Sequence, residues 1–170
     1  VRAIALLERE LAAAGPALPP RRYLMVGGRE GIYLDSLRHD IALRHLDNIE
    51  IVPEVDDPFV YYGAADVFVC SSFEEAFPRV LLEAAIFELP IATTDVNGVP
   101  EMLAPADAWL CPPGDPARLA AAMRGAIESV HTGDSTRPTR AKASITARFD
   151  ARTNLALHLA LAQATALAPK

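Results

Sequence analysis

The fold of this sequence is restricted most by an alternation between two kinds of apolar pattern. Short strand-like runs, most of them continuously apolar, lie at 23–26, 48–52, 67–70, 91–94 and 108–111. Segments with apolar residues at helical spacing lie around them, at 2–14, 34–46, 57–65, 78–87, 100–104, 115–130 and 151–166. Strands that alternate with helices predict an α/β fold, in which a parallel β-sheet carries helices on both faces.

Proline and aspartate mark where two of these helices begin. Asp57-Pro58 and Asp115-Pro116 each predict an N-cap residue followed by proline at the first helical position. The polar segment 131–139 predicts a loop. In 151–166 the leucines alternate with period two, as in a strand, but the alanine content and the length favour a helix.

The first helical segment, 2–14, resembles a crossover, and a crossover helix joins two parallel strands. Two interpretations stay open from the sequence alone. Either a strand precedes this helix in a longer polypeptide, or the helix only covers the sheet.

The composition is that of an ordinary folded domain, and it argues against several classes of protein. Of the 170 residues, 51% are hydrophobic and 22% are charged. The net charge of −6 argues against a broad nucleic-acid surface, although not against a small basic pocket. No apolar stretch reaches the ~18 residues that span a bilayer, and no export signal opens the sequence. We therefore expect a cytoplasmic protein.

The cysteines and histidines do not form a metal-binding pattern. Cys70 and Cys111 lie far apart, each in an apolar run, which favours buried free thiols over a disulfide. The four histidines have no ligand spacing, so we expect no metal site and no zinc chemistry.

The segment 71–83 combines two carboxylates with the start of a helix. Glu75 lies in the loop after a strand, the helix begins near Pro78, and Glu83 follows within that helix. Exposed N–H groups at a helix N-terminus suit phosphate, and a carboxylate accepts hydrogen bonds from sugar hydroxyls. Together they predict a pocket for a nucleotide that bears a sugar. From spacing alone, Glu75 as a helix-capping aid and Glu83 as a solvated residue remain alternatives.

Two glycine-containing loops also follow strands. Asn97-Gly98 permits positive φ and precedes another helix, so this loop is either a second wall of the pocket or an ordinary connection. Gly27-Gly28 and Gly31 do not complete the Gly-x-Gly-x-x-Gly pattern, so a dinucleotide site gains only weak support.

Four segments, taken in order, resemble the C-terminal half of GT-B-fold glycosyltransferases of the retaining family 4 type. They are Leu-Met-Val-Gly-Gly at 24–28, the strand and loop at 49–57, Tyr-Tyr-Gly-Ala-Ala-Asp-Val-Phe-Val-Cys-Ser-Ser at 61–72, and the Glu-x7-Glu signature with its Gly-x-Pro-Glu loop at 75–101. The match covers nearly the whole chain. The resemblance implies a Rossmann-like domain that lacks its first strand.

The resemblance also implies roles for individual residues. Glu83 matches the carboxylate that holds the donor ribose hydroxyls, and Glu75 matches the one beside the transferred sugar and reaction centre. The other positions implied to meet the donor are the diphosphate and sugar turn (Phe77, Pro78, Arg79 and Val80), the base contact (Val55), the facing loop (Asn97 and Gly98) and the glycine turn (Gly27 and Gly28).

The implied reaction moves a sugar from a nucleotide diphosphate sugar to an acceptor hydroxyl with retention of configuration. In this family it proceeds without a metal ion or another cofactor. The chain departs from the family at Pro78, Ala76 and Glu88, which replace common glycines. Pro78 donates no N–H group, so one phosphate contact is lost. Arg79 is either a nearby positive charge or a solvated helix residue.

The family's diphosphate-binding Arg and Lys and its acceptor-binding domain lie upstream of the segments matched here. We therefore expect residues 1–150 to form the donor-binding domain and 151–170 to form a helix that crosses back to the N-terminal domain. Alone, the chain should fold without catalysing transfer. The apolar face of its last helix favours self-association, and membrane-surface association is expected only through segments outside this chain.

Other functions stay open at this point. They are a non-catalytic nucleotide-sugar-binding module, a nucleotide-sugar epimerase of the same architecture, and a nicotinamide-dependent Rossmann domain. An epimerase needs further acid–base residues that the lone histidines do not supply.

Overall fold

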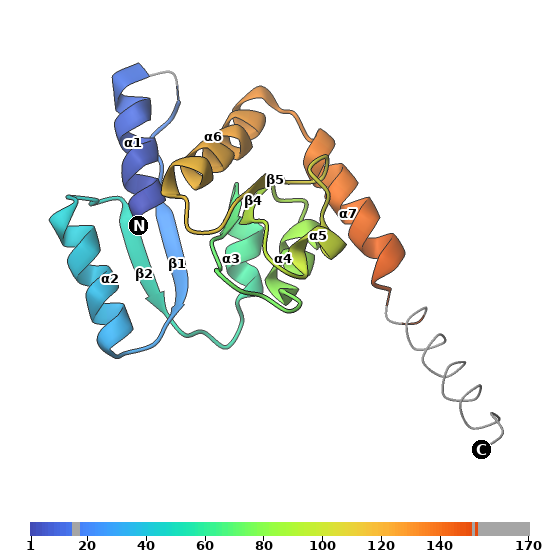
Figure 1. Cartoon of the computed structure of the whole chain (residues 1–170), viewed down its shortest axis with the longest axis horizontal. Coiled ribbons are helices and arrows are strands. Elements are labelled where there is room, and N and C mark those ends of the chain that lie inside the picture. Colours follow the sequence, from blue (N-terminus) through green and yellow to red (C-terminus); the bar gives the residue numbers. More distant parts are fainter. Residues whose placement is uncertain (15–17, 151, 153–170) are drawn as a thin grey trace.

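The computed structural model describes residues 1–14, 18–150 and 152. In this part the elements alternate as expected (Figure 1). The strands are β1 (Tyr23–Gly28), β2 (Ile49–Pro53), β3 (Phe68–Cys70), β4 (Ile91–Thr94) and β5 (Trp109–Cys111). The helices are α1 (Arg2–Ala14), α2 (Ile32–Leu43), α3 (Phe59–Ala64), α4 (Arg79–Ile86), α5 (Val99–Met102), α6 (Pro116–Thr132) and α7 (Thr136–Arg148).

All strand pairs in the described residues are parallel, but they form two sets. β1 pairs with β2, and β4 lies between β3 and β5. Within the described ranges no ladder joins β1 to β3, so each is the edge of its set. Figure 1 shows the β1–β2 pair beside the other three strands.

One hydrophobic layer nevertheless spans both sets of strands. Met25 of β1, Ala92 of β4 and Cys111 of β5 belong to the same cluster as Leu7 of α1 and Met123 of α6. The two sets therefore share a core beneath α1 and α6. The shared core joins the two sets although no ladder of hydrogen bonds does so in the described residues.

The opposite face is covered by α3, α4 and α7. Leu81 of α4, Ile91 of β4 and Ile145 of α7 belong to a second cluster. Adjacent strand residues point to opposite faces, and Ile91 and Ala92 fall in different clusters. Helices therefore lie on both faces of parallel strands, which confirms the predicted fold class.

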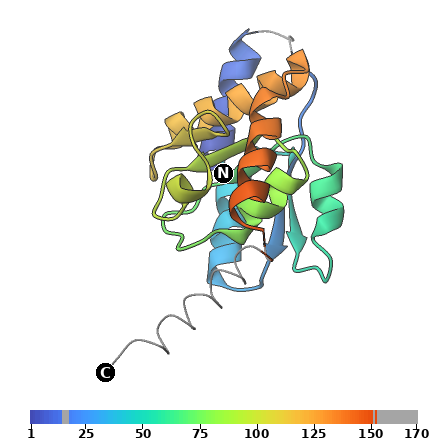
Figure 2. The same cartoon turned by 90° about the vertical axis from the view of Figure 1, so that its right-hand side faces the viewer.

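The loop expected at 131–139 is wrong, because two helices extend into it. α6 continues to Thr132 and α7 begins at Thr136, with only a short turn between them that contains Gly133 at φ 72°. The helix α7 is polar on average, but it packs against α4 (Figure 2), and its Ile145 lies in the same cluster as Leu81 of α4. Tertiary packing therefore stabilises a helix that local composition did not predict.

The two predicted helix caps have different outcomes. Asp115 is the N-cap of α6, and its side chain accepts hydrogen bonds from the backbone N–H groups of Ala117 and Arg118 at 3.0 Å each. At α3 the N-cap is Pro58 instead of Asp57. The Asp57 carboxylate still accepts a hydrogen bond from the Phe59 N–H group at 2.9 Å. Asp57 therefore bonds to the start of the helix although it lies one residue before the N-cap.

The two cysteines are both buried and free, as predicted for Cys70 and Cys111. Burial raises the pKa of the Cys111 thiol.

Two further expectations concern helices. None of the helices in 1–14, 18–150 and 152 has the length and apolar character that a bilayer crossing requires. The helix expected at 151–166 lies outside the described residues.

Candidate functional site

The loops after β3 and β4 meet at the carboxyl ends of their strands. The Gly98 N–H group donates to the carbonyl oxygen of Glu75 at 3.2 Å. The Thr94 hydroxyl donates to the carbonyl oxygen of Ser72 at 2.6 Å. The structure thus brings the predicted Glu75 loop and the predicted Asn97-Gly98 loop together, at the edge where open α/β sheets bind ligands.

The Asn97-Gly98 pair contains the positive φ that its sequence permits, but Gly98 itself is required for a different reason. The positive φ of this loop belongs to Asn97, at 37°, whereas Gly98 has φ −72°. A Cβ atom on Gly98 would lie 2.0 Å from the carbonyl oxygen of Ala76. Glycine therefore permits close contact between the two loops instead of a left-handed turn.

The Glu75 carboxylate is held by a neighbouring hydroxyl. Ser72 Oγ donates to Glu75 Oε1 at 2.7 Å, and both residues are half-buried. The N-cap of α4 is Pro78, which makes no side-chain cap bond. Within the described residues the Glu75 carboxylate accepts a hydrogen bond from Ser72 and from no N–H group of α4, so the helix-capping alternative gains no support.

The Glu83 carboxylate is also held by a hydroxyl. Tyr62 Oη of α3 donates to Glu83 Oε2 of α4 at 2.9 Å. Glu83 is half-buried, so the alternative of a solvated face residue is wrong. Burial and the neighbouring Glu83 carboxylate raise the pKa of Tyr62 far above its ordinary value. The phenol thus stays a hydrogen-bond donor over the physiological pH range.

Sequence reasoning did not identify Tyr62 or Ser72 as site residues. Both lie in the segment 61–72 that resembles the glycosyltransferase family. The resemblance therefore indicated the segment, but not which of its residues contact the two carboxylates. A Tyr-Tyr pair does not reveal which ring turns inward. In the structure Tyr62 is buried and Tyr61 is only half-buried.

The start of α4 is partly exposed beside the two carboxylates. Pro78 is buried, whereas Arg79 and Val80 form an exposed first turn. The Phe77 side chain is 45% exposed and meets the Phe149 ring edge-on, with centroids 5.3 Å apart. The predicted phosphate turn therefore lies on the surface of the site, with an aromatic contact to the end of α7.

The remaining predicted residues belong to the other strand pair. Gly27 has φ 95°, and a Cβ on Gly28 would meet Ile51 at 2.8 Å. Val55 is half-buried in the loop after β2. An ion pair between Arg29 and Glu54, at 2.6 Å, links the loops that follow β1 and β2. These residues lie at the carboxyl ends of their strands, as predicted.

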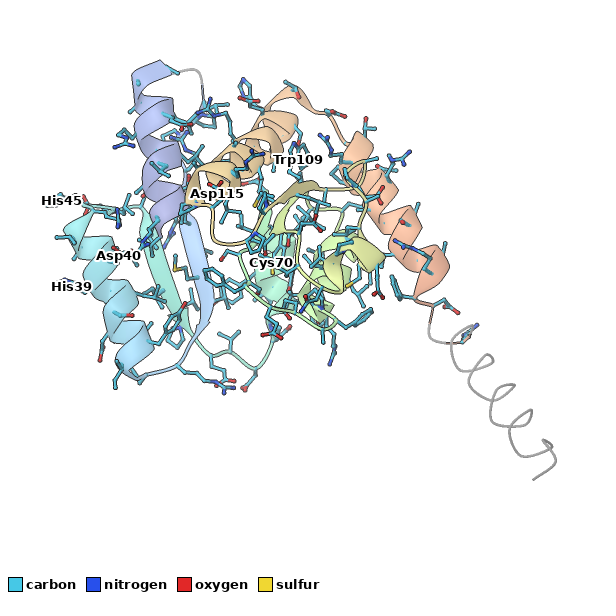
Figure 3. All side chains as sticks on the ribbon, in the orientation of Figure 1. His39, Asp40, His45, Cys70, Trp109 and Asp115 are labelled. Atoms are coloured by element: carbon cyan, nitrogen blue, oxygen red, sulfur yellow. The ribbon has the colours of Figure 1, made fainter. Side chains whose placement is uncertain are left out.

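Metal ligands do not gather in the described residues. No group of three His, Cys, Asp or Glu side chains is placed to hold an ion there. Figure 3 shows His39 and His45 near α2, apart from Cys70 in the other strand set. The expectation of metal-independent chemistry remains a prediction.

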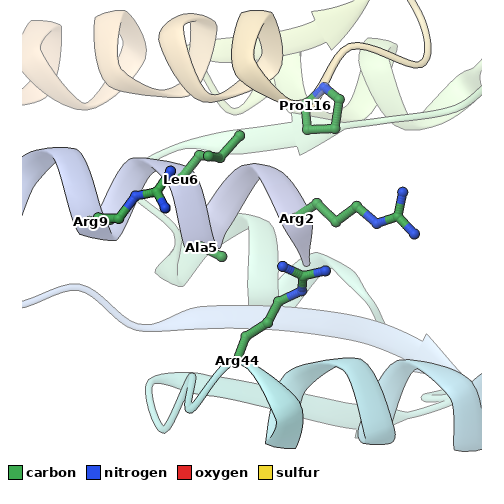
Figure 4. A pocket seen from close by; sticks show the side chains of 6 residues that line it. All are labelled: Arg2, Ala5, Leu6, Arg9, Arg44 and Pro116. Atoms are coloured by element: carbon green, nitrogen blue, oxygen red, sulfur yellow. The ribbon is translucent and has the colours of Figure 1, made fainter.

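A cavity of about 230 Å³ lies away from all these residues. It is lined by Arg2, Ala5, Leu6, Arg9, Arg44 and Pro116, between α1, α2 and α6 (Figure 4). None of the predicted site residues contributes to it. The candidate site at the carboxyl ends of the strands is built from two loops and a helix terminus.

The fold and the site define a class of protein, a Rossmann-like α/β domain with a polar binding edge at the carboxyl ends of its strands. The family model for group 1 glycosyl transferases matches residues 3–129. The chain belongs to this family, and the resemblance to the C-terminal half of GT-B-fold glycosyltransferases is confirmed.

Similar proteins include enzymes of several kinds. Over 51 residues the chain is 37% identical to the capsular polysaccharide biosynthesis glycosyltransferase CapM of Staphylococcus aureus, covering 30% of this chain and 13% of CapM. Sucrose-phosphate synthase of Thermosynechococcus elongatus superposes with a TM-score of 0.80 at 22% identity. That match covers 98% of this chain and 42% of the synthase.

Two further solved structures share the fold. Anabaena HepE, solved in complex with UDP, superposes with a TM-score of 0.78 at 24% identity, over 95% of this chain and 44% of HepE. The C-terminal domain of the group 1 glycosyl transferase LpcC of Francisella tularensis has a TM-score of 0.72 at 18% identity, over 88% and 79% of the two chains. This chain therefore spans less than half the length of CapM, the synthase and HepE.

Proposed function

We propose that the chain is the donor-binding part of a retaining glycosyltransferase of hexosyltransferase type, which takes a sugar from a nucleotide diphosphate sugar. The observation that carries this proposal is the pair of signature carboxylates. Glu75 and Glu83 are each held by a neutral hydroxyl donor, beside the start of α4. Family membership and the UDP complex of HepE support a nucleotide sugar as the ligand.

In this proposal each group has a separate task. Glu83 accepts hydrogen bonds from the ribose hydroxyls, and Glu75 lies against the transferred sugar. The exposed first turn of α4, with Arg79 beside it, meets the diphosphate, because a helix N-terminus favours anions. Val55 contacts the base, and the loop at Gly98 closes the sugar side.

Positioning and charge stabilisation supply the catalysis, without a resident metal or other cofactor. A donor held in the reactive geometry lowers the entropic part of the barrier, and dipoles aimed at the leaving diphosphate stabilise its developing charge. No nucleophilic side chain is assigned. The acceptor binds to an N-terminal domain of a longer, cytoplasmic protein, and residues 1–170 alone catalyse no transfer.

An additional strand between the two strand sets belongs to the same proposal. The edge strands β1 and β3 expose apolar side chains, with Leu24 45%, Val26 40% and Val69 37% exposed. Strands of parallel sheets are normally buried on both faces. A strand supplied by the longer protein would hydrogen-bond to both free edges, and its own side chains would flank these residues on the faces of the sheet. Amide exchange in β1 and β3 should then be slower in that protein than in this chain.

Calorimetric titration of the chain with UDP, GDP and ADP tests the function. We expect binding selective for one base, weakened about tenfold in Glu83→Gln, since a hydrogen bond to a charged group contributes about 1.5–3 kcal/mol. Glu128→Gln, an exposed carboxylate on α6, is the matched control. Selective binding that Glu83→Gln leaves intact would contradict the assigned site.

A non-catalytic nucleotide-sugar-binding module is the second candidate, and the hydroxyl-held carboxylates alone fit it equally. Assaying the longer protein for sugar transfer separates the two functions. Turnover that disappears in Glu75→Gln supports the enzyme, whereas donor binding without turnover supports the binding module.

A further inference from the structure

Tyr62 is held in place by a cluster of aromatic rings. Its ring centroid lies 5.5 Å from that of Phe68, 5.6 Å from that of Phe87 and 6.2 Å from that of Phe59. Only 9% of the residue is exposed. Because these rings come from α3, β3 and the end of α4, the phenol oxygen has little freedom to move.

Glu83 is half-buried, and within the described residues its carboxylate is hydrogen-bonded by Tyr62. A glutamate side chain has three rotatable bonds, and fixing it costs about 1.5–2 kcal/mol of conformational entropy. The Tyr62 hydroxyl, at 2.9 Å from Oε2, provides that restraint before any ligand arrives. Since the phenol donates only one hydrogen bond, to Oε2, Oε1 keeps its lone pairs for other donors.

We propose that Tyr62 is a positioning residue that orients the Glu83 carboxylate and thereby makes the site selective for nucleotides with intact ribose hydroxyls. This inference rests on the proposed role of Glu83 in ribose binding. Preorganisation of a binding group increases affinity by removing the cost of ordering it. The benefit applies only to ligands that use the group, so a nucleotide without ribose hydroxyls gains nothing from it.

The variant Tyr62→Phe isolates the hydroxyl, because it retains the ring and its stacking partners. The measurement is the dissociation constant of the chain for UDP, GDP and ADP and for their 2′,3′-dideoxy counterparts. We expect Tyr62→Phe to weaken binding of the preferred ribonucleotide about five- to tenfold and to leave its dideoxy counterpart unchanged. Tyr61→Phe, one residue earlier and only half-buried, should change neither constant.

The ratio of the two constants separates positioning from a general structural role. A folding defect in Tyr62→Phe would weaken both ligands equally, whereas lost positioning reduces only the preference for ribose. The double variant Tyr62→Phe/Glu83→Gln should bind no more weakly than Glu83→Gln alone, because the phenol acts through the carboxylate.

Failure of this inference is distinguishable from failure of the proposed function. If the unmodified chain binds a ribonucleotide and Tyr62→Phe leaves the ribose preference unchanged, the positioning role is wrong and the function stands. If neither this chain nor the longer protein that contains the upstream strand and basic residues binds a nucleoside diphosphate, both are overturned.

Discussion

The backbone of Gly98 lies directly against the carbonyl oxygen of Ala76, and a Cβ atom at residue 98 would stand 2.0 Å from that oxygen. The contact joins the loop after β4 to the loop that carries Glu75, and the Gly98 N–H bond to the Glu75 carbonyl reinforces it. The two loops therefore form one structural unit. A substitution at residue 98 should therefore also displace the Glu75 carboxylate.

The variant Gly98→Ala should separate these loops. Because the atom in the way is backbone, the loops must shift, and overpacking of this kind costs about 1–3 kcal/mol of unfolding free energy. Urea denaturation measures that loss. In Gly63→Ala the new Cβ would lie 3.7 Å from Phe87, an ordinary contact, so this control should be neutral or slightly stabilised. Equal stability of Gly98→Ala and the unmodified chain would contradict the close contact.

A second prediction concerns the hydroxyl that holds Glu75. Ser72→Ala removes the donor 2.7 Å from Glu75 Oε1. Since Glu75 is assigned to the transferred sugar, affinity for the nucleotide sugar should fall about three- to tenfold, while affinity for the nucleoside diphosphate stays constant. Calorimetry with both ligands checks this. Ser36→Ala, an exposed serine on α2, is the control. Equal weakening of both ligands would argue against the sugar assignment.

Much of the fold could be predicted because its signals are local. The run Ile91–Thr94 is buried at every position, and the strand occupies the same residues that the sequence indicated. The helix α7 could not be predicted, because its stability comes from packing against α4 instead of from its own polar sequence. A local sequence pattern can predict a segment whose consecutive residues are all buried. It cannot predict a helix that is stabilised mainly by packing against a segment far away in the sequence.

The candidate site shows the same division. Glu75 and Glu83 could be selected from a spaced motif that follows a strand. Tyr62 could not be selected as a partner, because it is 21 residues from Glu83 in sequence and meets it only through the fold. Ser72 lies near Glu75 in sequence, but spacing alone does not show that its hydroxyl turns toward that carboxylate. The positive φ that the Asn97-Gly98 pair permits is present at Asn97, but the close approach of the two loops at Gly98 could not be predicted, because it leaves no mark in a single sequence.

A third prediction concerns pH and the cluster around Glu8 of α1. The Arg21 guanidinium and the Tyr23 hydroxyl hydrogen-bond to the Glu8 carboxylate at 2.8 and 2.6 Å. The bond from Arg21 is the main cause that holds the pKa of Glu8 below its ordinary value of 4.5, against an opposing effect of burial. The ionised carboxylate is therefore stabilised in the folded state.

A lowered pKa gives stability above the unfolded-state pKa, and that stability is lost as the pH falls through the folded-state pKa. At pH 7 Glu8→Gln should reduce the unfolding free energy by about 1–2 kcal/mol. The difference from the unmodified chain should shrink below pH 4.5. Denaturation at a series of pH values tests this. Glu54→Gln, whose partner Arg29 is exposed, should show a much smaller change. A difference independent of pH would contradict the ionic account.

The last prediction concerns Leu81, which anchors the helix that carries Glu83. Leu81 is fully buried, at 0% exposed, and belongs to the cluster between α4, β4 and α7. Leu81→Ala removes buried methyl groups and leaves a cavity, so the unfolding free energy should fall by about 2.7–5 kcal/mol. Leu43→Ala, at a leucine 66% exposed on α2, should change it by no more than about 0.5 kcal/mol.

Denaturant unfolding of both variants measures the two losses. Because Leu81 faces the core while Glu83 meets Tyr62, the folded fraction of Leu81→Ala should keep its preference for ribose over dideoxyribose nucleotides. If Leu81→Ala loses stability but keeps its ribose preference, then Leu81 stabilises α4 while Glu83 and Tyr62 determine ligand binding. A loss in Leu81→Ala as small as in Leu43→Ala would show that α4 does not pack as the structure has it.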